Sequence, residues 1–535
     1  MRAFARLLDR LAFTPARNAK LTLVRDFLRD SPDPDRGWAL AALTGTLSFD
    51  VAKPAFIRKA VESRMDGELF ALSYDYVGDL AETVALVWPQ RPGSNRQEPE
   101  ISEVVDALQS ALRSDVQMLI ETWLDALDAD GRWALLKLLT GGLRVGVSAR
   151  LAKQALAEMG GVDIAAIEEI WHGQRPPYED LFAWLEGRSE RPSPKAPGRF
   201  RPVMLAQALD ESTDLPRLDP ADYAAEWKWD GIRVQAVSEN GTRRLYSRTG
   251  DDIAGSFPDV IAALNFDGVI DGELLISRDG AVAPFADLQQ RLNRKSPDAK
   301  VIARYPAFIR AYDLLLDGEI DLRALPFRER RARLEQFVAH ASGARLDISP
   351  LVSFDAWQTL GRLRASPPEG DPKLAEGLML KRWDSVYEAG RPKGPWFKWK
   401  RDPHLIDAVL LYAQRGHGKR SSFYSDFTFG VWREDANGER ALAPVGKAYF
   451  GFTDEELKQL DTFVRDHTVE RFGPVRAVRA DKDFGLVLEV AFEGLQRSTR
   501  HKSGVAMRFP RINRIRWDKP AREADELATL ERMLP

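Results

Sequence analysis

Apolar residues recur three and four positions apart in the first part of the chain. This spacing places side chains on one face of an α-helix, and it predicts helices over residues 103–112, 116–127 and 133–139. Residues 1–13 also fit an amphipathic helix. Their arginines would suit a cleaved transit peptide as well, but Asp9 favours the helix. The first part of the chain is therefore predicted to be all-α.

A helix with clear end signals closes this part. Gly141-Gly142 interrupts the periodicity, and Ser148 is placed to cap a helix over residues 149–159 that ends at Gly160-Gly161. A stretch rich in proline follows over residues 187–202, with Pro192, Pro194, Pro197 and Pro202. This composition is typical of a linker between domains.

Short strands separated by turns replace the helical pattern after this stretch. Strand-like runs are predicted over residues 232–237, 244–247, 269–276, 377–381, 408–412, 427–432, 447–452 and 486–492, and no internal repeat is present. A chain of 535 residues also exceeds what one compact core usually holds. We therefore expect three domains: an all-α domain over residues 1–203, an α+β domain over 204–400 and a small β-barrel domain over 401–535.

Composition excludes some classes of function. The chain has no cysteine, which rules out disulfides and thiolate zinc sites, and its histidines lack metal-ligand spacing. No apolar run approaches the ~18 residues of a membrane span, so no membrane association is expected. The net charge of −3 does not by itself indicate nucleic acid, but one stretch is basic. It holds Arg500, Lys502, Arg508, Arg511, Arg514, Arg516 and Lys519 against Asp518. Such a stretch is either a solvated surface or a phosphate-binding face.

The sequence EWKWDGIR, residues 226–233, places a lysine between acids and tryptophans. Side chains alternate in an extended strand, so Glu226, Lys228 and Asp230 share one face and Trp227 and Trp229 the other. Taken alone, this pattern also fits a surface ion pair.

A predicted hairpin brings two arginines close to this lysine. Asn240-Gly241 is a strong two-residue turn, and pairing back from it sets Arg233 opposite Arg248. Like charges in such positions destabilise a sheet. We therefore expect an anion, such as a nucleotide phosphate, between the two arginines; a slipped register or splayed side chains is the alternative.

Three further runs combine charges with apolar strands. VIDGEL (residues 269–274) embeds acids in an apolar strand, where they need cationic or metal partners. EGLMLK (376–381) ends on a lysine, and in WFKWK (396–400) Lys398 and Lys400 project from one face. Each run alone is commonplace, but their order and spacing are not.

In this order the motifs resemble those of the covalent nucleotidyltransferases, and specifically of the ATP-dependent DNA ligases. Lys228 in KWDGIR matches the nucleophile of that family. The resemblance implies a helical DNA-binding domain, an α+β adenylyltransferase domain of the ATP-grasp-like nucleotidyltransferase type and an OB-fold barrel. Residues 138–148 (LLTGGLRVGVS) resemble the helical domain of larger ligases, and residues 508–519 (RFPRINRIRWDK) resemble the last motif of the family.

The resemblance also implies roles for other residues. Glu226 would help to read the adenine amino group, and Tyr312 in AYDLLL would stack on adenine. Arg233 and Arg248 would contact the AMP sugar and the 5′-phosphate of the nick. Glu273 and Glu376 would be the acids associated with the metal. The residues implied to contact phosphates are Lys381, Lys398 and Lys400, joined by Arg516, Asp518 and Lys519 of the last motif at the pyrophosphate of ATP.

The implied activity is that of an ATP-dependent DNA ligase. Lys228 would take AMP from ATP, AMP would pass to the 5′-phosphate of a nick, and the 3′-hydroxyl would displace it. The implied cofactors are ATP and Mg²⁺, with Mn²⁺ as a substitute. The implied partner is nicked duplex DNA of any sequence, encircled by a monomer. The expected location is the bacterial cytoplasm at the nucleoid, in replication, repair or recombination.

Three other classes of protein share part of this pattern. RNA ligases and mRNA-capping enzymes share the motifs around Lys228, but they lack the helical domain and this last motif. NAD-dependent ligases resemble a zinc-bearing, cysteine-containing architecture, which a chain without cysteine does not fit. A DNA-binding scaffold with an inactive core would have lost catalytic positions, whereas every motif residue is present here.

Overall fold

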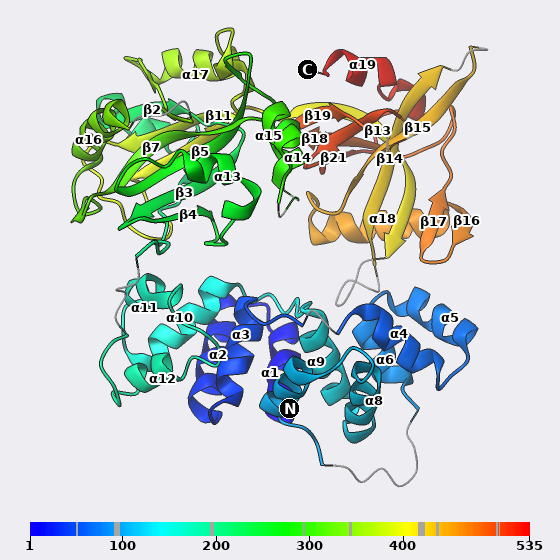
Figure 1. Cartoon of the computed structure of the whole chain (residues 1–535). Coiled ribbons are helices and arrows are strands. Elements are labelled where there is room, and N and C mark those ends of the chain that lie inside the picture. Colours follow the sequence, from blue (N-terminus) through cyan, green and yellow to red (C-terminus); the bar gives the residue numbers. More distant parts are fainter. Residues whose placement is uncertain are drawn as a thin grey trace. The chain divides into compact units, whose positions relative to one another are not determined.

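The computed structural model describes the chain except residues 50–51, 90–96, 193–196, 293, 295, 342–344, 416–422, 435–437, 499–500, 502 and 535. Pro194 of the proline-rich stretch and Arg500 and Lys502 of the basic stretch thus lie outside the described residues. Residue contacts divide the chain into two units. The first comprises Met1–Gly161, Pro176–Leu185 and Pro403–Pro535, and the second comprises Val162–Arg175 and Glu186–Asp402. Each unit is described by itself (Figure 1).

Helices make up the first unit up to Gly161, as the apolar periodicity predicts. They are α1 (Arg2–Phe13), α2 (Arg17–Asp30), α3 (Asp35–Thr44), α4 (Pro54–Glu62), α5 (Gly67–Val77), α6 (Leu80–Val87), α7 (Ile101–Ser110), α8 (Val116–Ala126), α9 (Ala129–Thr140) and α10 (Ala149–Gly160), and α12 (Glu179–Leu185) belongs to the same unit. The capping prediction is confirmed, since Ser148 Oγ accepts a hydrogen bond from the backbone N–H of Leu151 at 3.2 Å and Gly161 ends α10 in the left-handed conformation.

A curled β-sheet forms the rest of the first unit. Its strands are β13 (His404–Arg415), β14 (Tyr424–Glu434), β15 (Arg440–Ala448), β16 (Thr468–Phe472), β17 (Val475–Val478), β18 (Val487–Phe492) and β21 (Arg511–Arg516), with a separate hairpin of β19 (Gly494–Arg497) and β20 (Val505–Arg508). The strand order is β15-β14-β13-β17-β16, and β18 bridges β13 and β21. The helices are α18 (Asp454–Asp466) and α19 (Leu527–Arg532). Apolar residues such as Phe427, Phe429 and Phe492 fill the core.

One strand prediction in this region is wrong in its position. We expected a strand over residues 447–452, but β15 ends at Ala448. Tyr449 and Phe450 are exposed, and Gly451 has a φ of 100°, which a strand does not adopt. The apolar run therefore belongs to the connection before α18.

Two sheets form the framework of the second unit. One runs in the order β1-β12-β11-β2-β10 and the other in the order β4-β3-β5-β7-β8, with β6 beside β5 and β9 beside β7. The first sheet comprises β1 (Gln207–Ala208), β2 (Tyr223–Trp227), β10 (Leu351–Val352), β11 (Gly377–Arg382) and β12 (Trp396–Lys400). The second comprises β3 (Ile232–Glu239), β4 (Thr242–Ser247), β5 (Gly268–Arg278), β6 (Ala281–Val282), β7 (Ala307–Asp317), β8 (Ile320–Asp321) and β9 (Leu346–Ile348).

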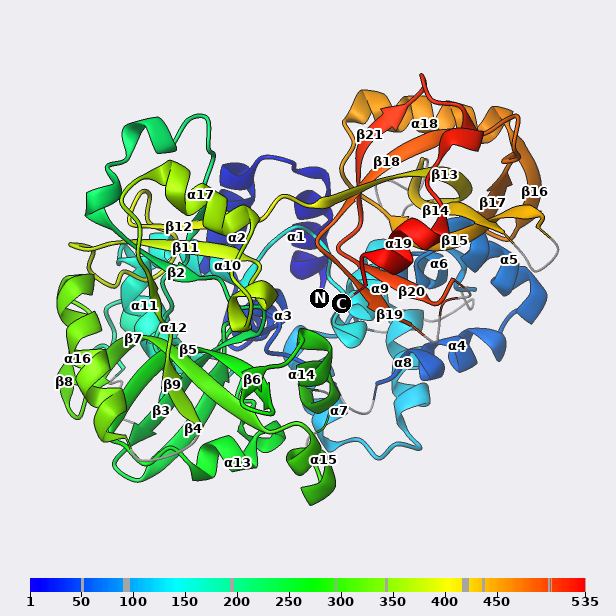
Figure 2. The ribbon, with the colours of Figure 1, turned by 90° about the horizontal axis from the view of Figure 1, so that it is seen from above.

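Helices cover the outer surfaces of these sheets. α16 (Phe327–His340) packs on β7, α17 (Trp357–Ala365) on β11, α14 (Phe285–Leu292) on β5, and α13 (Pro258–Ala262) on β4 and β7 (Figures 1 and 2). The unit also contains α11 (Ile164–Trp171) and α15 (Ala299–Arg304). This arrangement leaves the facing surfaces of the two sheets to form the site.

The predicted fold class is confirmed: a helical region, an α+β region and a barrel-like β region follow one another along the chain. The domain boundaries at residues 203 and 400 stay a prediction, because contacts alone define two units. Among the described residues, no helix has the length and apolarity needed to cross a bilayer.

Candidate active site

Lys228 directly follows the buried strand β2, and its backbone is fixed on both sides. Its N–H donates to the carbonyl of Gly377 at 2.9 Å, and the N–H of Glu376 donates to the carbonyl of Lys228 at 2.7 Å. On its other side, Gly377 allows β12 to approach closely, because a Cβ there would lie 2.3 Å from the carbonyl oxygen of Trp399. The ammonium of Lys228 forms an ion pair with the carboxylate of Glu376.

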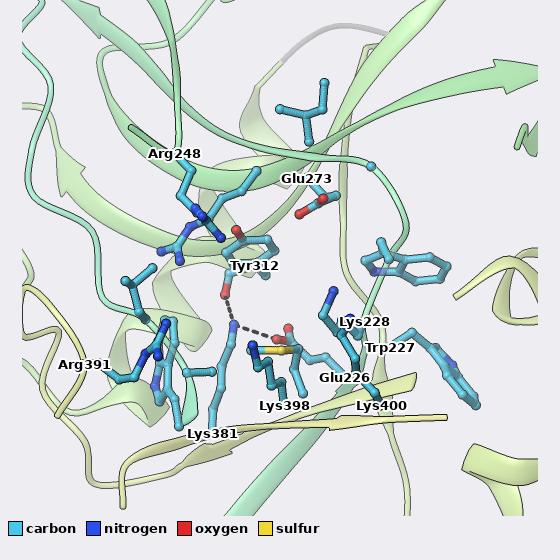
Figure 3. Close-up of a pocket in the computed structure, with 18 of the residues that line it drawn as sticks. Glu226, Trp227, Lys228, Arg248, Glu273, Tyr312, Lys381, Arg391, Lys398 and Lys400 are labelled. Carbon is cyan, nitrogen blue, oxygen red and sulfur yellow. Dashed lines mark hydrogen bonds and ion pairs between the residues drawn. The ribbon is translucent and has the colours of Figure 1, made fainter. Parts of the chain in front are cut away.

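The tryptophans beside Lys228 explain its orientation. Trp227 and Trp229 are buried in an apolar cluster with Phe397 and Trp399, at the side of the first sheet covered by α17. Burial of two indoles stabilises this orientation by several kcal/mol, at about 25 cal/mol per Å² of apolar surface. Lys228 lines a cavity (Figure 3), but the predicted alternation through Asp230 is wrong: β2 ends at Trp227, and both tryptophans line the same cavity.

The cavity has a volume of about 550 Å³ and lies between the two sheets of the second unit. β2, β11 and β12 contribute residues from one side, and β3, β5 and β7 from the other. The lining residues predicted from the sequence are Glu226, Lys228, Arg233, Arg248, Glu273, Tyr312, Lys381, Lys398 and Lys400. Residues as far apart in the sequence as Glu226 and Lys400 therefore line one cavity.

Positive side chains dominate the wall of the cavity. Lys228, Arg248, Lys398 and Lys400 are joined there by Arg391, which the sequence analysis missed. Partial burial, and then the nearby charges of Lys400 and Arg391, lower the pKa of Lys398. A cavity that places so many cations together suits a ligand with several negative charges, such as a polyphosphate.

The hairpin prediction is confirmed in its turn and wrong in its arginine pair. Asn240 and Gly241 have φ of 49° and 77°, and Glu239 pairs with Thr242. The β3–β4 ladder stops at Val234 and Ser247, so Arg233 and Arg248 are not cross-strand partners, although both line the cavity.

The protein supplies its own anion to Arg233. The Nε of Arg233 donates to Asp271 Oδ1 at 2.9 Å, and the guanidinium also contacts the hydroxyl of Tyr387 at 3.1 Å. Asp271 is fully buried and accepts a further hydrogen bond from Tyr387 at 2.6 Å. The acids of VIDGEL (residues 269–274) were expected to need cationic or metal partners. For Asp271 this prediction is confirmed, because Arg233 is its cationic partner. Tyr387 carried no signal in the sequence.

Glu226 is the centre of a buried ionic group. Its carboxylate accepts from Lys381 Nζ at 2.6 Å and from Arg331 Nη1 at 2.9 Å, and the side chain is 2% exposed. Burial raises the pKa of Glu226, and the charges of Lys381 and Arg331 oppose that rise. Lys381 also donates to the backbone carbonyl of Tyr312 at 3.1 Å, and its ammonium lies 4.5 Å from the centre of that ring (Figure 3). Arg331, on α16, was not predicted from the sequence.

Glu273 differs from Glu226 in having no such partners. In the described part of the chain, its carboxylate makes no hydrogen bond or ion pair, and burial raises its pKa to about 8. The charges of Lys228 and Arg233 oppose that rise. A half-buried carboxylate that forms no ion pair with the described residues is a place where a cation can bind favourably.

The donor set fits a magnesium ion shared with a nucleotide. Mg²⁺ in such sites uses one or two carboxylates together with substrate phosphates and water. Glu273 lines the cavity and Glu376 contacts Lys228 at its edge. Among the described residues, no group of three or more histidines or acids is placed to hold a metal ion.

The last predicted group lies in the first unit, at the end of β21. Arg516 contacts Asp518 through Nε at 3.0 Å and Nη2 at 2.9 Å, and this pairing lowers the pKa of Asp518 to about 2. Lys519 Nζ donates to Asp407 at 2.6 Å. Asp407, on β13, was not singled out in the sequence.

Three family descriptions match successive parts of the chain. "DNA ligase N terminus" matches residues 1–157, "ATP dependent DNA ligase domain" residues 203–400, and "ATP dependent DNA ligase C terminal region" residues 420–519. A "Probable DNA ligase" of Koribacter versatilis is 30% identical over 99% of this chain and 96% of its own length. The chain belongs to the ATP-dependent DNA ligases. Members of this family seal nicks in DNA through a lysyl-AMP intermediate.

Other relatives agree with this assignment. "DNA ligase 1" of Korarchaeum cryptofilum is 30% identical over all of this chain and 97% of its own length. A "Probable DNA ligase" of Opitutus terrae is 32% identical over 99% of this chain, which spans 62% of that longer protein. The solved structure named "Pmar-Lig_Pre." has a TM-score of 0.60 at 16% identity and covers 96% of this chain and 99% of its own, which supports the ligase fold.

Proposed function

We propose that this ligase seals nicks in duplex DNA with Lys228 as its nucleophile. The observation that carries the proposal is the position of Lys228: it lines a cavity of about 550 Å³ whose wall also carries Arg248, Lys398 and Lys400. Lys228 lies among these cations, is held in place by its ion pair with Glu376 and faces the space where a triphosphate would bind. Nucleophilic catalysis by lysine requires such a setting.

In the first step, Lys228 Nζ gives one proton to solvent, attacks the α-phosphorus of ATP as a neutral amine and releases a second proton to solvent. A P–N bond forms, the bond from the α-phosphorus to the bridging oxygen breaks, and pyrophosphate leaves. Lys398, Lys400 and Arg248 stabilise the developing negative charge. Mg²⁺, with Mn²⁺ as a substitute, would be held by Glu273 and Glu376 and would supply further positive charge to the phosphates.

The other residues bind and orient the nucleotide. Tyr312 supplies an aromatic surface for adenine, and Glu226 with its neighbouring backbone reads the adenine amino group. Arg233 contacts the sugar from its place beside Asp271. Lys381 acts near the phosphates, with its ammonium anchored on Glu226. Arg516, Asp518 and Lys519 contact the pyrophosphate of ATP.

Two further transfers complete the reaction. An oxygen of the DNA 5′-phosphate attacks the phosphorus of lysyl-AMP, so the P–N bond breaks and Lys228 is regenerated. The 3′-hydroxyl then attacks the 5′-phosphorus and expels AMP, which closes the phosphodiester. Arg248 contacts the 5′-phosphate of the nick.

The substrate is nicked double-stranded DNA of any sequence. Residues 1–203 would bind its phosphates, residues 204–400 carry out adenylyl transfer and residues 401–535 form the OB-fold domain. Backbone contacts without base contacts suit an enzyme that must act at any sequence. A monomer would encircle the duplex, in the bacterial cytoplasm at the nucleoid.

Incubation with α-labelled ATP and Mg²⁺, followed by addition of singly nicked duplex DNA, tests the proposal. Wild type is compared with Lys228→Ala and with Lys373→Ala. Lys373 is an exposed lysine of the same unit that pairs with Glu369 and lies outside the cavity lining. We expect label on wild type and Lys373→Ala, none on Lys228→Ala, and loss of label from the protein as nicks close.

Three results would overturn the proposal. Label on Lys228→Ala equal to that on wild type would move the nucleophile elsewhere. An unlabelled wild type that binds nicked DNA would indicate the inactive scaffold, and sealing of nicked RNA in preference to nicked DNA would indicate an RNA ligase.

A further inference from the structure

Asp407 holds two cations of the last ligase motif on a single carboxylate oxygen. Lys519 Nζ lies 2.6 Å from Asp407 Oδ2, and Arg516 Nη1 lies 3.4 Å from the same oxygen. Asp407 lies on β13, more than 100 residues before the cations in the chain. The two positive groups are therefore gathered at one point by a residue outside the motif.

The backbone fixes Asp407 firmly. Its N–H donates to the Oδ2 of Asp525 at 2.8 Å, and the N–H of Asp525 donates to the carbonyl of Asp407 at 2.8 Å. Asp407 also pairs with Glu489 in the β13–β18 ladder. The carboxylate thus starts from a rigid part of the barrel rather than from a loop.

The second carboxylate oxygen of Asp407 gives a further reason why this side chain needs positive charge beside it. Within the described chain, Oδ1 is buried and has no hydrogen-bond partner. A largely buried carboxylate with one unsatisfied oxygen is stabilised by adjacent positive charge, and removing that charge is costly. Lys519 is thus held at Asp407 at 2.6 Å, whereas Arg516 contacts Asp518 most closely, at 2.9 Å, and lies 3.4 Å from Asp407 and 3.9 Å from Glu489.

A second contact fixes the segment from its other face. Trp517, between Arg516 and Asp518, packs edge-on against Phe463 of α18 at 5.8 Å between ring centroids. Alternation of side chains at the end of β21 directs Arg516 toward Asp407 and Trp517 toward α18. The segment is thereby held by an ionic contact on one face and an aromatic contact on the other.

We propose that Asp407 is a positioning residue for the first step of the ligase reaction: it sets Lys519 and Arg516 in the arrangement that receives the pyrophosphate of ATP. This inference rests on the proposed function, which assigns those two cations to the pyrophosphate. Asp407 itself does not touch the substrate. Its loss slows self-adenylation and leaves the sealing of a nick that already carries AMP unchanged, because no pyrophosphate takes part in that step.

The test compares Asp407→Asn, Asp407→Glu, Lys519→Met and the double variant Asp407→Asn/Lys519→Met with wild type. Asp426→Asn is the matched control, because Asp426 pairs with Lys447 at 3.0 Å elsewhere in the same barrel. The rates measured are formation of lysyl-AMP from ATP and sealing of a pre-adenylated nick. Thermal unfolding of each variant shows that it is folded.

We expect Asp407→Asn to slow lysyl-AMP formation on the order of 10- to 100-fold, which is the size of effect that a misplaced reacting group has. The rate of sealing a pre-adenylated nick should stay within about twofold of wild type. Asp407→Glu should recover part of the rate. When Lys519 is already methionine, adding Asp407→Asn should reduce the rate of lysyl-AMP formation much less than it does in wild type, because the two residues act as a unit.

Equal loss in both reactions, or full additivity of the two substitutions, would overturn the inference and assign Asp407 a structural role. An Asp407→Asn variant that adenylates as fast as wild type or faster would overturn it as well. Failure of the proposed function looks different, because wild type itself would then form no lysyl-AMP.

Discussion

Lys228 and Glu376 are joined twice, once through their backbones and once through their side chains. The N–H of Glu376 donates to the carbonyl of Lys228 at 2.7 Å, and the carboxylate of Glu376 forms an ion pair with the ammonium of Lys228. The backbone bond extends the β2–β11 pairing by one step, so Lys228, the proposed nucleophile, and Glu376 keep their relative position through the sheet rather than through a loop.

Glu376→Gln should therefore slow lysyl-AMP formation without unfolding the protein. The backbone bond remains, but a neutral amide neither pairs with Lys228 nor carries a charge for a metal ion. We expect a loss on the order of 100-fold, comparable to the effect of a misplaced reacting group. Single-turnover labelling with α-labelled ATP measures it. Glu369→Gln, which removes an exposed acid of the same unit, should behave as wild type, and equal rates for both variants would contradict the role of Glu376.

Glu226→Gln should destabilise the second unit. The substitution leaves Lys381 and Arg331 buried without their shared carboxylate, and breaking a buried ionic group by removing one partner costs about 3–5 kcal/mol. Urea unfolding measures the change. Glu335→Gln is the matched control, because Glu335 also pairs with Arg331 but its side chain is 54% exposed, and its loss should cost under about 1 kcal/mol. Equal effects of the two would contradict the prediction.

Lys398→Met should raise thermal stability while it weakens use of ATP. The pKa of Lys398 is lowered by burial and by neighbouring cations, so the folded state binds this proton less tightly than the unfolded state. The stability of wild type consequently rises with pH as Lys398 loses its proton, and below the lowered pKa the full cost of the charge is present. Methionine removes that cost.

The melting temperature of Lys398→Met should exceed that of wild type most at pH 7, and the gap should narrow as the pH rises toward the usual lysine pKa of about 10.4. Thermal unfolding between pH 7 and 10 without nucleotide measures it, while the KM for ATP in self-adenylation should rise. A gap that widens with pH would contradict the direction of the pKa shift.

The sequence predicted local structure well where side-chain periodicity and turn chemistry act within a few residues. The capped helix after Ser148 and the turn at Asn240-Gly241 both formed as expected. The strand expected over residues 447–452 ends at Ala448 instead, because Tyr449 and Phe450 carry the apolar signal of a strand yet remain exposed in a connection.

Ionic partners were harder to predict, because they depend on which strands become neighbours. The acid of Asp271 was expected to need a cation, but only the pairing of β3 with β5 brings Arg233 to it. Arg331 and Asp407 lie outside every motif, and α16 and β13 respectively place them against motif residues. Their roles follow from tertiary contacts that periodicity does not encode.

The basic stretch of the first unit leads to a prediction about DNA. Arg516 and Lys519 are held by Asp407, and Arg511 lies 3.8 Å from Glu493, whereas Arg514 is exposed on β21. A guanidinium in that position can replace counter-ions on a DNA phosphate. Arg514→Ala should therefore weaken binding of nicked duplex about equally for every sequence tested, and reduce the slope of log K against log salt by about one.

Fluorescence anisotropy with nicked duplexes of different sequence, over a series of salt concentrations, measures both quantities. Arg465→Ala is the matched control, since Arg465 is a half-exposed arginine of the same barrel that pairs with Asp461 within α18. Self-adenylation should stay at the wild-type rate in both variants, because no DNA takes part in it. A slope equal to that of wild type would exclude Arg514 from the phosphate contacts. A loss confined to one sequence would instead assign it to the bases, since only base edges distinguish sequences directly.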